Sequence, residues 1–125
     1  ELGAPLCRSF LFFERLIDPS DLVEIKHTTI VMEQDHSRTD DTGTRRMINL
    51  DPGYVTEAKV VLATTKDFPH RIYIGRGIYA ESTLQYRKQP GSYQAVEHTY
   101  PDFRSEQAIA LFNAARERLR SMLER

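Results

Sequence analysis

Apolar and polar side chains alternate along two neighbouring segments in the second half of the chain. The segments Arg71–Ile74 and Ile78–Arg87 are rich in β-branched and aromatic residues, and they flank Gly75-Arg76-Gly77. Because glycine accepts the positive φ that a tight connection requires, the pattern predicts a β-hairpin with these three residues as its loop. The expected cross-strand pairs are Ile74 with Ile78, Tyr73 with Tyr79, Ile72 with Ala80, and Arg71 with Glu81.

Alternation of side chains along each strand predicts one apolar and one polar face for this hairpin. The apolar face is expected to contain Ile72, Ile74, Ile78, Ala80 and Leu84. The opposite face is expected to contain Arg71, Tyr73, Tyr79, Glu81 and Thr83. This second face carries the most suggestive chemistry in the sequence, and we expect the rest of the chain to fold around the hairpin.

Two helices have clear start signals. Ser105 is a suitable N-cap, and apolar residues recur after it at helical spacing, opposite a stripe of arginine and glutamate. The sequence Asp18-Pro19-Ser20-Asp21 combines an N-cap, a proline at the first helical position and an acidic residue near the positive helix terminus. It predicts a helix through about Asp35, although the β-branched run Thr28–Val31 would also suit a strand.

Shorter elements are predicted along the rest of the chain. Strands are expected at Phe10–Phe13, Met47–Leu50 and Tyr93–Val96. Turns are expected at Asp51-Pro52-Gly53 and Gln89–Ser92, and an exposed mobile loop at His36–Arg46. Within Thr99–Arg104, the residue before the proline is expected to be extended. Thr56 is expected to cap a short helix, whereas Val60-Val61-Leu62 would also suit a buried strand. The fold class is therefore α+β, with a mainly antiparallel sheet around the central hairpin and the C-terminal amphipathic helix packed on one face.

Length, charge and cysteine content narrow the classes of protein. The 125 residues suffice for a single domain, residues 1–125, with one core. A formal net charge of −1 gives no signal for nucleic-acid binding, and no apolar run is long enough to cross a membrane. Cys7 is the only cysteine, which fits a reducing cytoplasm. Since the chain does not begin with methionine, we expect it to be the C-terminal portion of a longer protein.

Several strings occur in an order that resembles one protein family. They are Asn49-Leu50-Asp51-Pro52-Gly53-Tyr54, Leu62-Ala63-Thr64-Thr65-Lys66-Asp67, His70-Arg71-Ile72-Tyr73, Gly77-Ile78-Tyr79-Ala80-Glu81, Thr83-Leu84 and Thr99-Tyr100-Pro101-Asp102-Phe103-Arg104. The sequence is similar to an uncharacterised bacterial domain-of-unknown-function family, whose members are often labelled GTP-binding proteins. The resemblance covers most of the chain and implies a bacterial cytosolic protein. It also implies that an N-terminal segment of the family is missing here.

The GTP-binding label can be compared with the motifs present. A P-loop requires Gly-x-x-x-x-Gly-Lys followed by Ser or Thr, so that backbone amides surround the phosphates, and this motif is absent. Thr65-Lys66-Asp67 also lacks the residue that separates Lys from Asp in a guanine-reading Thr-Lys-x-Asp string. If the protein binds a nucleotide, it is therefore expected to do so without a P-loop.

No metal site is expected from the spacing of the histidines. His27, His36, His70 and His98 are isolated, without an i, i+4 pair. His70 falls on the predicted apolar side of the hairpin, and we interpret it as a hydrogen-bonded core histidine rather than a ligand.

The candidate site lies at the entrance of the hairpin. Lys66 and Arg71 supply positive charge, Tyr73 and Tyr79 an aromatic surface, and Glu81 an opposing carboxylate. The simplest alternative for Arg71 and Glu81 is a cross-strand ion pair without a ligand.

The leading prediction of function is binding of a phosphate-bearing small molecule, with a nucleotide such as GTP as the specific candidate. One alternative is an acid-base or metal-assisted enzyme that uses Asp51 and Glu81 as catalytic residues. Another is a structural protein-interaction domain without a small-molecule site. No cofactor is indicated by any motif. We also expect a homodimer, or a contact with the missing N-terminal segment, because exposed strand edges tend to pair.

Overall fold

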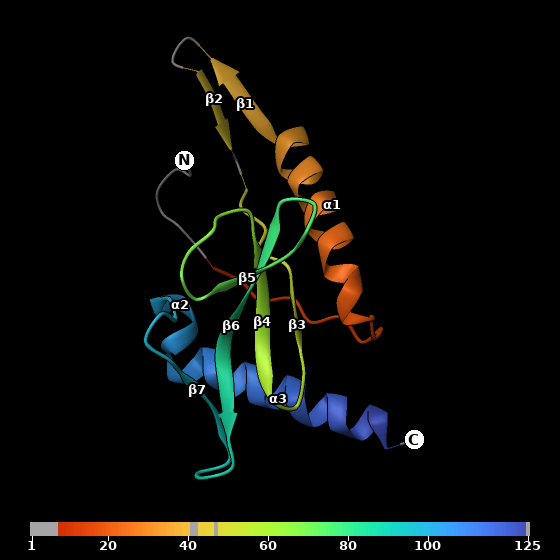
Figure 1. Cartoon of the computed structure of the whole chain (residues 1–125), viewed down its shortest axis with the longest axis vertical. Coiled ribbons are helices and arrows are strands. Elements are labelled where there is room, and N and C mark those ends of the chain that lie inside the picture. Colours follow the sequence, from red (N-terminus) through yellow and green to blue (C-terminus); the bar gives the residue numbers. More distant parts are fainter. Residues whose placement is uncertain (1–7, 41–42, 47, 125) are drawn as a thin grey trace.

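The computed structural model describes residues 8–40, 43–46 and 48–124 (Figure 1). A 3₁₀ turn (Pro19–Asp21) leads into α1 (Leu22–Asp35), which is followed by the hairpin β1 (Ser37–Asp40) and β2 (Gly43–Arg46). The main sheet contains β3 (Gly53–Val55), β4 (Lys59–Thr64), β5 (Arg71–Gly75), β6 (Ile78–Arg87) and β7 (Ser92–Ala95). The short helix α2 (Pro101–Arg104) and the long helix α3 (Glu106–Leu123) complete the fold. The predicted α+β class is confirmed.

The main sheet is antiparallel and centred on β6. Its order is β3-β4-β6-β5, and β7 also pairs with β6. The first half of β6 pairs with β5 and the second half with β7, while β4 pairs along the opposite edge of β6. The long strand therefore joins all the other strands except β3, which pairs with β4.

The predicted hairpin is confirmed, with a change at its tip. Arg71, Ile72 and Tyr73 pair with Glu81, Ala80 and Tyr79 as expected, but Ile78 pairs with Gly75 instead of Ile74. The loop is a two-residue turn at Arg76 and Gly77, with φ values of 51° and 81°, and Ile74 is accommodated as a bulge. Positive φ at both positions matches the twist of the strands, which favours this turn over the longer predicted loop.

A second irregularity divides the core between the two faces of the sheet. Val60 of β4 pairs with Leu84, but Val61 pairs with Ser82, so Thr83 is an extra residue in β6. Because side chains alternate with a period of two, this bulge moves Leu84 to the face opposite Ile78. The predicted single apolar face is wrong for this reason.

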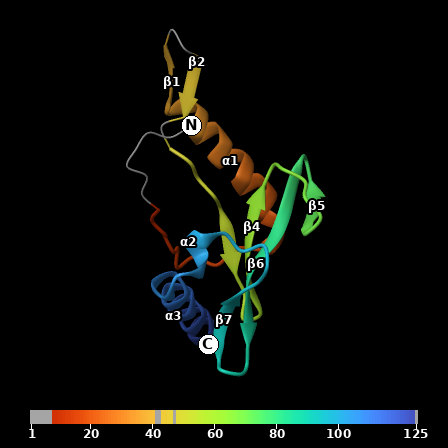
Figure 2. The same ribbon diagram turned by 90° about the vertical axis from the view of Figure 1, so that its left-hand side faces the viewer.

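A helix covers each face. Leu84 packs on the α3 side with Val60, Tyr93, Phe103 and Phe112. Ile78 packs on the α1 side with Leu22, Val61 and Ala63. In Figure 2, α1 lies against one end of the sheet and α2 and α3 lie towards the other end. The C-terminal helix packs on one face as predicted, and its N-cap is Ser105, whose side chain accepts a hydrogen bond from the Ala108 amide.

Other predicted elements are confirmed or corrected by the structure. The Asp18 cap, the helix ending at Asp35, the turn before β7 and β7 itself are confirmed. Phe10–Phe13 is not a strand; the Phe10 ring instead packs against Phe103 and Phe112. In the predicted loop His36–Arg46, the described residues after His36 form β1 and β2. The residue before Pro101, Tyr100, is extended as predicted, and α2 follows it.

The segment before β4 also differs from the prediction. Ile48–Leu50 is not a strand, Met47 lies outside the described residues, and Gly53 begins β3 without the positive φ expected of it. Thr56 caps a turn rather than a helix, since its Oγ1 accepts from the amides of Ala58 and Lys59. The alternative strand at Val60-Val61-Leu62 is the correct one. Burial of Val60 and Val61 on opposite faces suits a central strand better than a one-sided helix.

Tyr93 provides a pH-dependent test of this core. Its hydroxyl donates to the backbone carbonyl oxygen of Thr56, and burial raises its pKa to about 12. An unfolded tyrosine has a pKa of about 10, so the unfolded chain loses this proton first and stability falls as the pH rises from about 10 towards 12. We expect Tyr93→Phe to remove about 1 kcal/mol of the decline in unfolding free energy between about pH 9 and 11.

Urea denaturation at each pH measures this effect. The matched control is Tyr73→Phe, which removes the hydroxyl of a tyrosine that is 57% exposed and lies outside this core. Identical profiles for Tyr93→Phe and the wild type would contradict the assignment.

Candidate functional site

A buried ion pair joins β5 to β6. Arg71 and Glu81 lie opposite each other in the hairpin, and Arg71 Nε donates to Glu81 Oε1 at 2.9 Å. Their side chains are only 5% and 4% exposed. The guanidinium also donates to the Lys66 carbonyl oxygen at 3.1 Å and to the Tyr100 hydroxyl at 3.4 Å. Arg71 thus connects the hairpin with the segments before β5 and before α2.

Glu81 is fully engaged at both carboxylate oxygens. Oε1 lies 3.1 Å from His70 Nε2 in addition to its bond with Arg71. Oε2 accepts a hydrogen bond from Thr83 Oγ1 at 3.2 Å. Thr83 is the bulged residue of β6, so the residue at the irregularity that divides the core also donates to the carboxylate.

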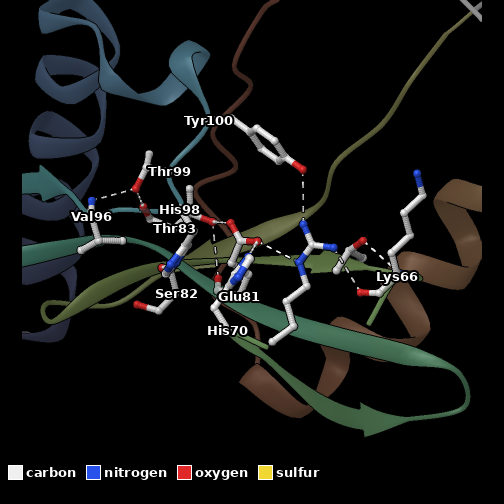
Figure 3. Close-up of polar contacts among 11 residues, drawn as sticks. Lys66, His70, Glu81, Ser82, Thr83, Val96, His98, Thr99 and Tyr100 are labelled. Carbon is white, nitrogen blue, oxygen red and sulfur yellow. Dashed lines mark hydrogen bonds and ion pairs between the residues drawn. The ribbon is translucent and has the colours of Figure 1, made fainter. Parts of the chain in front are cut away.

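His98 joins this cluster from the loop between β7 and α2 (Figure 3). Its ring stacks on His70, with centroids 4.1 Å apart and planes 12° apart. Its Nε2 lies 2.9 Å from the Ser82 carbonyl oxygen. A carbonyl can only accept, so Nε2 carries the proton and Nδ1 of the neutral ring has a free lone pair. Thr99 fixes the loop by accepting from the Val96 amide and donating to the Thr83 carbonyl oxygen.

The structure supports part of the predicted site arrangement. Arg71 and Glu81 form one cross-strand pair, and Tyr73 and Tyr79 form a neighbouring pair on the same face, with ring centroids 5.2 Å apart. Lys66 contributes its backbone carbonyl, while its exposed side chain extends away from Glu81 (Figure 3). Lys66 and Arg71 therefore do not face Glu81 together.

Asp51 belongs to a different group of charges. Its carboxylate accepts from Arg8 at 2.8 Å and from Asn49 at 3.2 Å, and Arg8 also contacts Asp102. No contact between the described residues joins Asp51 to Glu81. The two predicted catalytic carboxylates do not form a common site.

His70 was predicted as a hydrogen-bonded core histidine. The hydrogen bond, with Glu81, is present, but His70 does not lie in the core. Its side chain is 32% exposed and faces the ion pair. His98 was missed because it is distant from His70 in the sequence. A search for local histidine spacing cannot detect a pair that forms only when the loop after β7 packs against the loop before β5.

A shallow open depression lies beside the cluster. Its volume is about 390 Å³, and it is lined by Asp67, Phe68, Pro69 and Arg71. The Phe68 ring covers the guanidinium at 4.6 Å and lies nearly parallel to the His70 ring, at 6.1 Å. The lining combines a delocalised cation, a carboxylate and an exposed aromatic face.

Sequence comparison identifies the family. A family model described as a domain of unknown function, DUF4416, matches residues 1–119. The chain belongs to this family. The predicted domain-of-unknown-function family is thus confirmed, while the GTP-binding label and the bacterial origin remain predictions. No curated protein and no solved structure matches the sequence. Among the described residues, no helix has the length and apolar character needed to cross a membrane.

The buried pair predicts a large, specific effect on stability. Glu81→Gln keeps the shape of the side chain but removes the charge opposite Arg71, which leaves a buried cation without its counterion. We expect the unfolding free energy to fall by about 3–5 kcal/mol. Glu24→Gln removes the charge from the 2.8 Å contact with Arg76, but these side chains are 71% and 64% exposed, so the expected loss is below about 1 kcal/mol.

Urea denaturation of both variants checks the comparison. Replacing the whole pair, in Arg71→Met with Glu81→Leu, should cost less than Glu81→Gln because neither charge remains buried. Equal small losses for Glu81→Gln and Glu24→Gln would show that the pair contributes no more than a surface contact.

Proposed function

We propose that this protein binds a phosphate-bearing small molecule at the depression beside β5. The observation that carries the proposal is a depression lined by Asp67, Phe68 and Arg71 that begins one residue after the exposed Lys66. Within the part of the chain that the structure describes, no side-chain contact engages the Lys66 ammonium group. Lys66 immediately precedes Asp67 and Phe68, which line the depression.

The neighbouring side chains suit a ligand that carries a phosphate and a flat ring. Lysine binds phosphate as a mobile point charge. The Arg71 guanidinium, of whose five N–H groups described contacts use three, adds positive charge to the lining of the depression. Phe68 is 46% exposed and offers a face for stacking, and Asp67 can accept a hydrogen bond from a sugar hydroxyl.

These features favour a nucleotide over inorganic phosphate. The negative charge of Asp67 repels inorganic phosphate, which is a multiply charged anion. A sugar hydroxyl can instead donate a hydrogen bond to the Asp67 carboxylate. GTP is the specific candidate, because members of the family that the sequence resembles are often labelled as GTP-binding. Since the sequence has no P-loop, the phosphates would be held in another way. Tyr73 and Tyr79 extend the aromatic surface along the hairpin.

Lys66→Ala tests the proposal. Loss of a charge-assisted contact of about 1.5–3 kcal/mol should weaken binding of GTP by about tenfold or more. Stability should change by less than about 0.5 kcal/mol, since Lys66 is exposed. Isothermal titration calorimetry with GTP and with inorganic phosphate measures the effect, and Lys88→Ala is the matched control because Lys88 is exposed in the turn before β7.

Phe68→Ala separates the two parts of the ligand. It should weaken GTP binding but leave any phosphate binding unchanged. Arg71→Ala is a poor probe, because it leaves Glu81 buried without its counterion. Equal GTP affinity in Lys66→Ala, Lys88→Ala and the wild type, or no GTP or phosphate binding by the wild type, would exclude the site.

A second candidate function, protein association, is favoured by the edge strand β5. Ile72, Tyr73 and Ile74 are 69%, 57% and 36% exposed, and in the described sheet β5 pairs with β6 alone. Exposed apolar edges pair readily, and two copies of β5 can pair antiparallel across a two-fold axis.

Light scattering should then show a concentration-dependent dimer that Ile72→Lys abolishes. A monomer at all concentrations would contradict this association.

A further inference from the structure

We propose that His70, Glu81 and His98 form a binding site for a divalent transition-metal ion, with Zn²⁺ as the representative ion. The inference goes beyond nucleotide binding and does not depend on it. Each residue offers one ligand atom, and the three atoms all lie within 4.8 Å of one another. Two imidazoles and one carboxylate are a donor set that suits zinc and its first-row neighbours.

The hydrogen bonds around the cluster match those that orient metal ligands. A metal-bound histidine usually donates its other ring N–H to a carbonyl or carboxylate, which fixes the ring and its tautomer. His98 already makes this bond through Nε2 to the Ser82 carbonyl oxygen, at 2.9 Å. Its Nδ1 is then the ligand atom, supplied without a change of tautomer.

Glu81 is similarly held by groups that are not ligands. Arg71 donates to Oε1 at 2.9 Å and Thr83 to Oε2 at 3.2 Å. Ligating carboxylates are commonly hydrogen-bonded in this way, and Oε2, whose described contact is with Thr83, has a second lone pair for a metal. The buried carboxylate is therefore fixed in position before an ion arrives.

Binding requires a small movement of His70. Ligands at about 2.0–2.1 Å from a tetrahedral zinc lie about 3.3 Å apart, so atoms up to 4.8 Å apart must approach each other. His70 Nε2 must also exchange its bond with Glu81 for the metal, and the rings must leave their parallel stack. The His70 side chain is 32% exposed and lies outside the strands, so it can rotate without disturbing the core.

Three protein ligands leave one position of a tetrahedral ion open, and the charge of the site favours an anion or water there. Arg71 already balances Glu81, so a bound divalent ion adds uncompensated positive charge. Water, hydroxide or another anion would complete the coordination shell on the exposed side of His70. This is also the side where Phe68, which lines the depression, lies beside His70.

Zinc titration calorimetry of four proteins tests the site. All should carry Cys7→Ser, which removes the only thiol as a competing ligand. We expect one Zn²⁺ per chain in this background, and a loss of at least tenfold in affinity in His70→Ala and in His98→Ala. His36→Ala is the matched control, because His36 is an exposed histidine at the C-terminal end of α1. The Zn²⁺ affinity of this variant should be unchanged.

Cobalt provides a readout independent of folding energy. Co²⁺ bound to nitrogen and oxygen ligands should give visible d–d absorption in the Cys7→Ser protein and in His36→Ala, but not in His98→Ala. Far-UV circular dichroism of His98→Ala checks that this variant is folded.

Failure of this proposal is distinguishable from failure of nucleotide binding. Lys66→Ala should retain full Zn²⁺ affinity, because its side chain extends away from Glu81. Absence of stoichiometric Zn²⁺ binding, or wild-type affinity in both His70→Ala and His98→Ala, would overturn the metal site whatever the result with GTP.

Discussion

The buried pair of Arg71 and Glu81 is the constraint on which the arrangement around the hairpin depends. Two charges removed from water are costly unless each is hydrogen-bonded at nearly every polar atom. Here the partners come from the strand bulge, the loop before β5, the segment before α2 and the opposite strand. Displacement of any of these segments would leave a buried polar group without a partner. The pair thus fixes hairpin register and the approach of the loops simultaneously.

The bulge at Thr83 connects this polar cluster with the apolar core. One extra residue in β6 lets the strand contribute Ile78 to the core under α1 and Leu84 to the core under α3. The same residue donates its hydroxyl to Glu81 and its carbonyl oxygen accepts from Thr99. A regular strand would place Leu84 on the α1 face. Thr83 therefore belongs both to the bulge that divides the core and to the polar cluster around Glu81.

The two proposed binding activities occupy adjacent parts of this cluster. The nucleotide proposal uses its outer side, where no described side-chain contact engages the Lys66 ammonium group and Phe68 is exposed. The metal proposal uses its inner side, where Glu81 is held rigidly and His98 has a free Nδ1. Arg71 lies between them, as a lining group of the depression and a partner of the carboxylate. Its many contacts make it a structural centre of the site rather than a freely available ligand group.

The sequence by itself determined the features that depend on neighbouring residues. The pairing of Arg71 with Glu81, the caps at Asp18 and Ser105 and the family could all be predicted, because turns, caps and alternation act over short distances. The predicted binding residues other than Lys66 were correctly placed on one face of the hairpin, although their role in binding is a proposal.

Tertiary structure decided the features that depend on packing between segments far apart in the sequence. Val60-Val61-Leu62 is a strand because both faces of β4 are covered, which local propensity cannot reveal. The Thr83 bulge arises because the α1 and α3 cores must both be filled. Likewise, His98 meets His70 and Glu81 only when the loop after β7 packs across β6. The spacing of histidines along the chain cannot predict this contact, because burial and hydrogen bonding between segments far apart in sequence stabilise it.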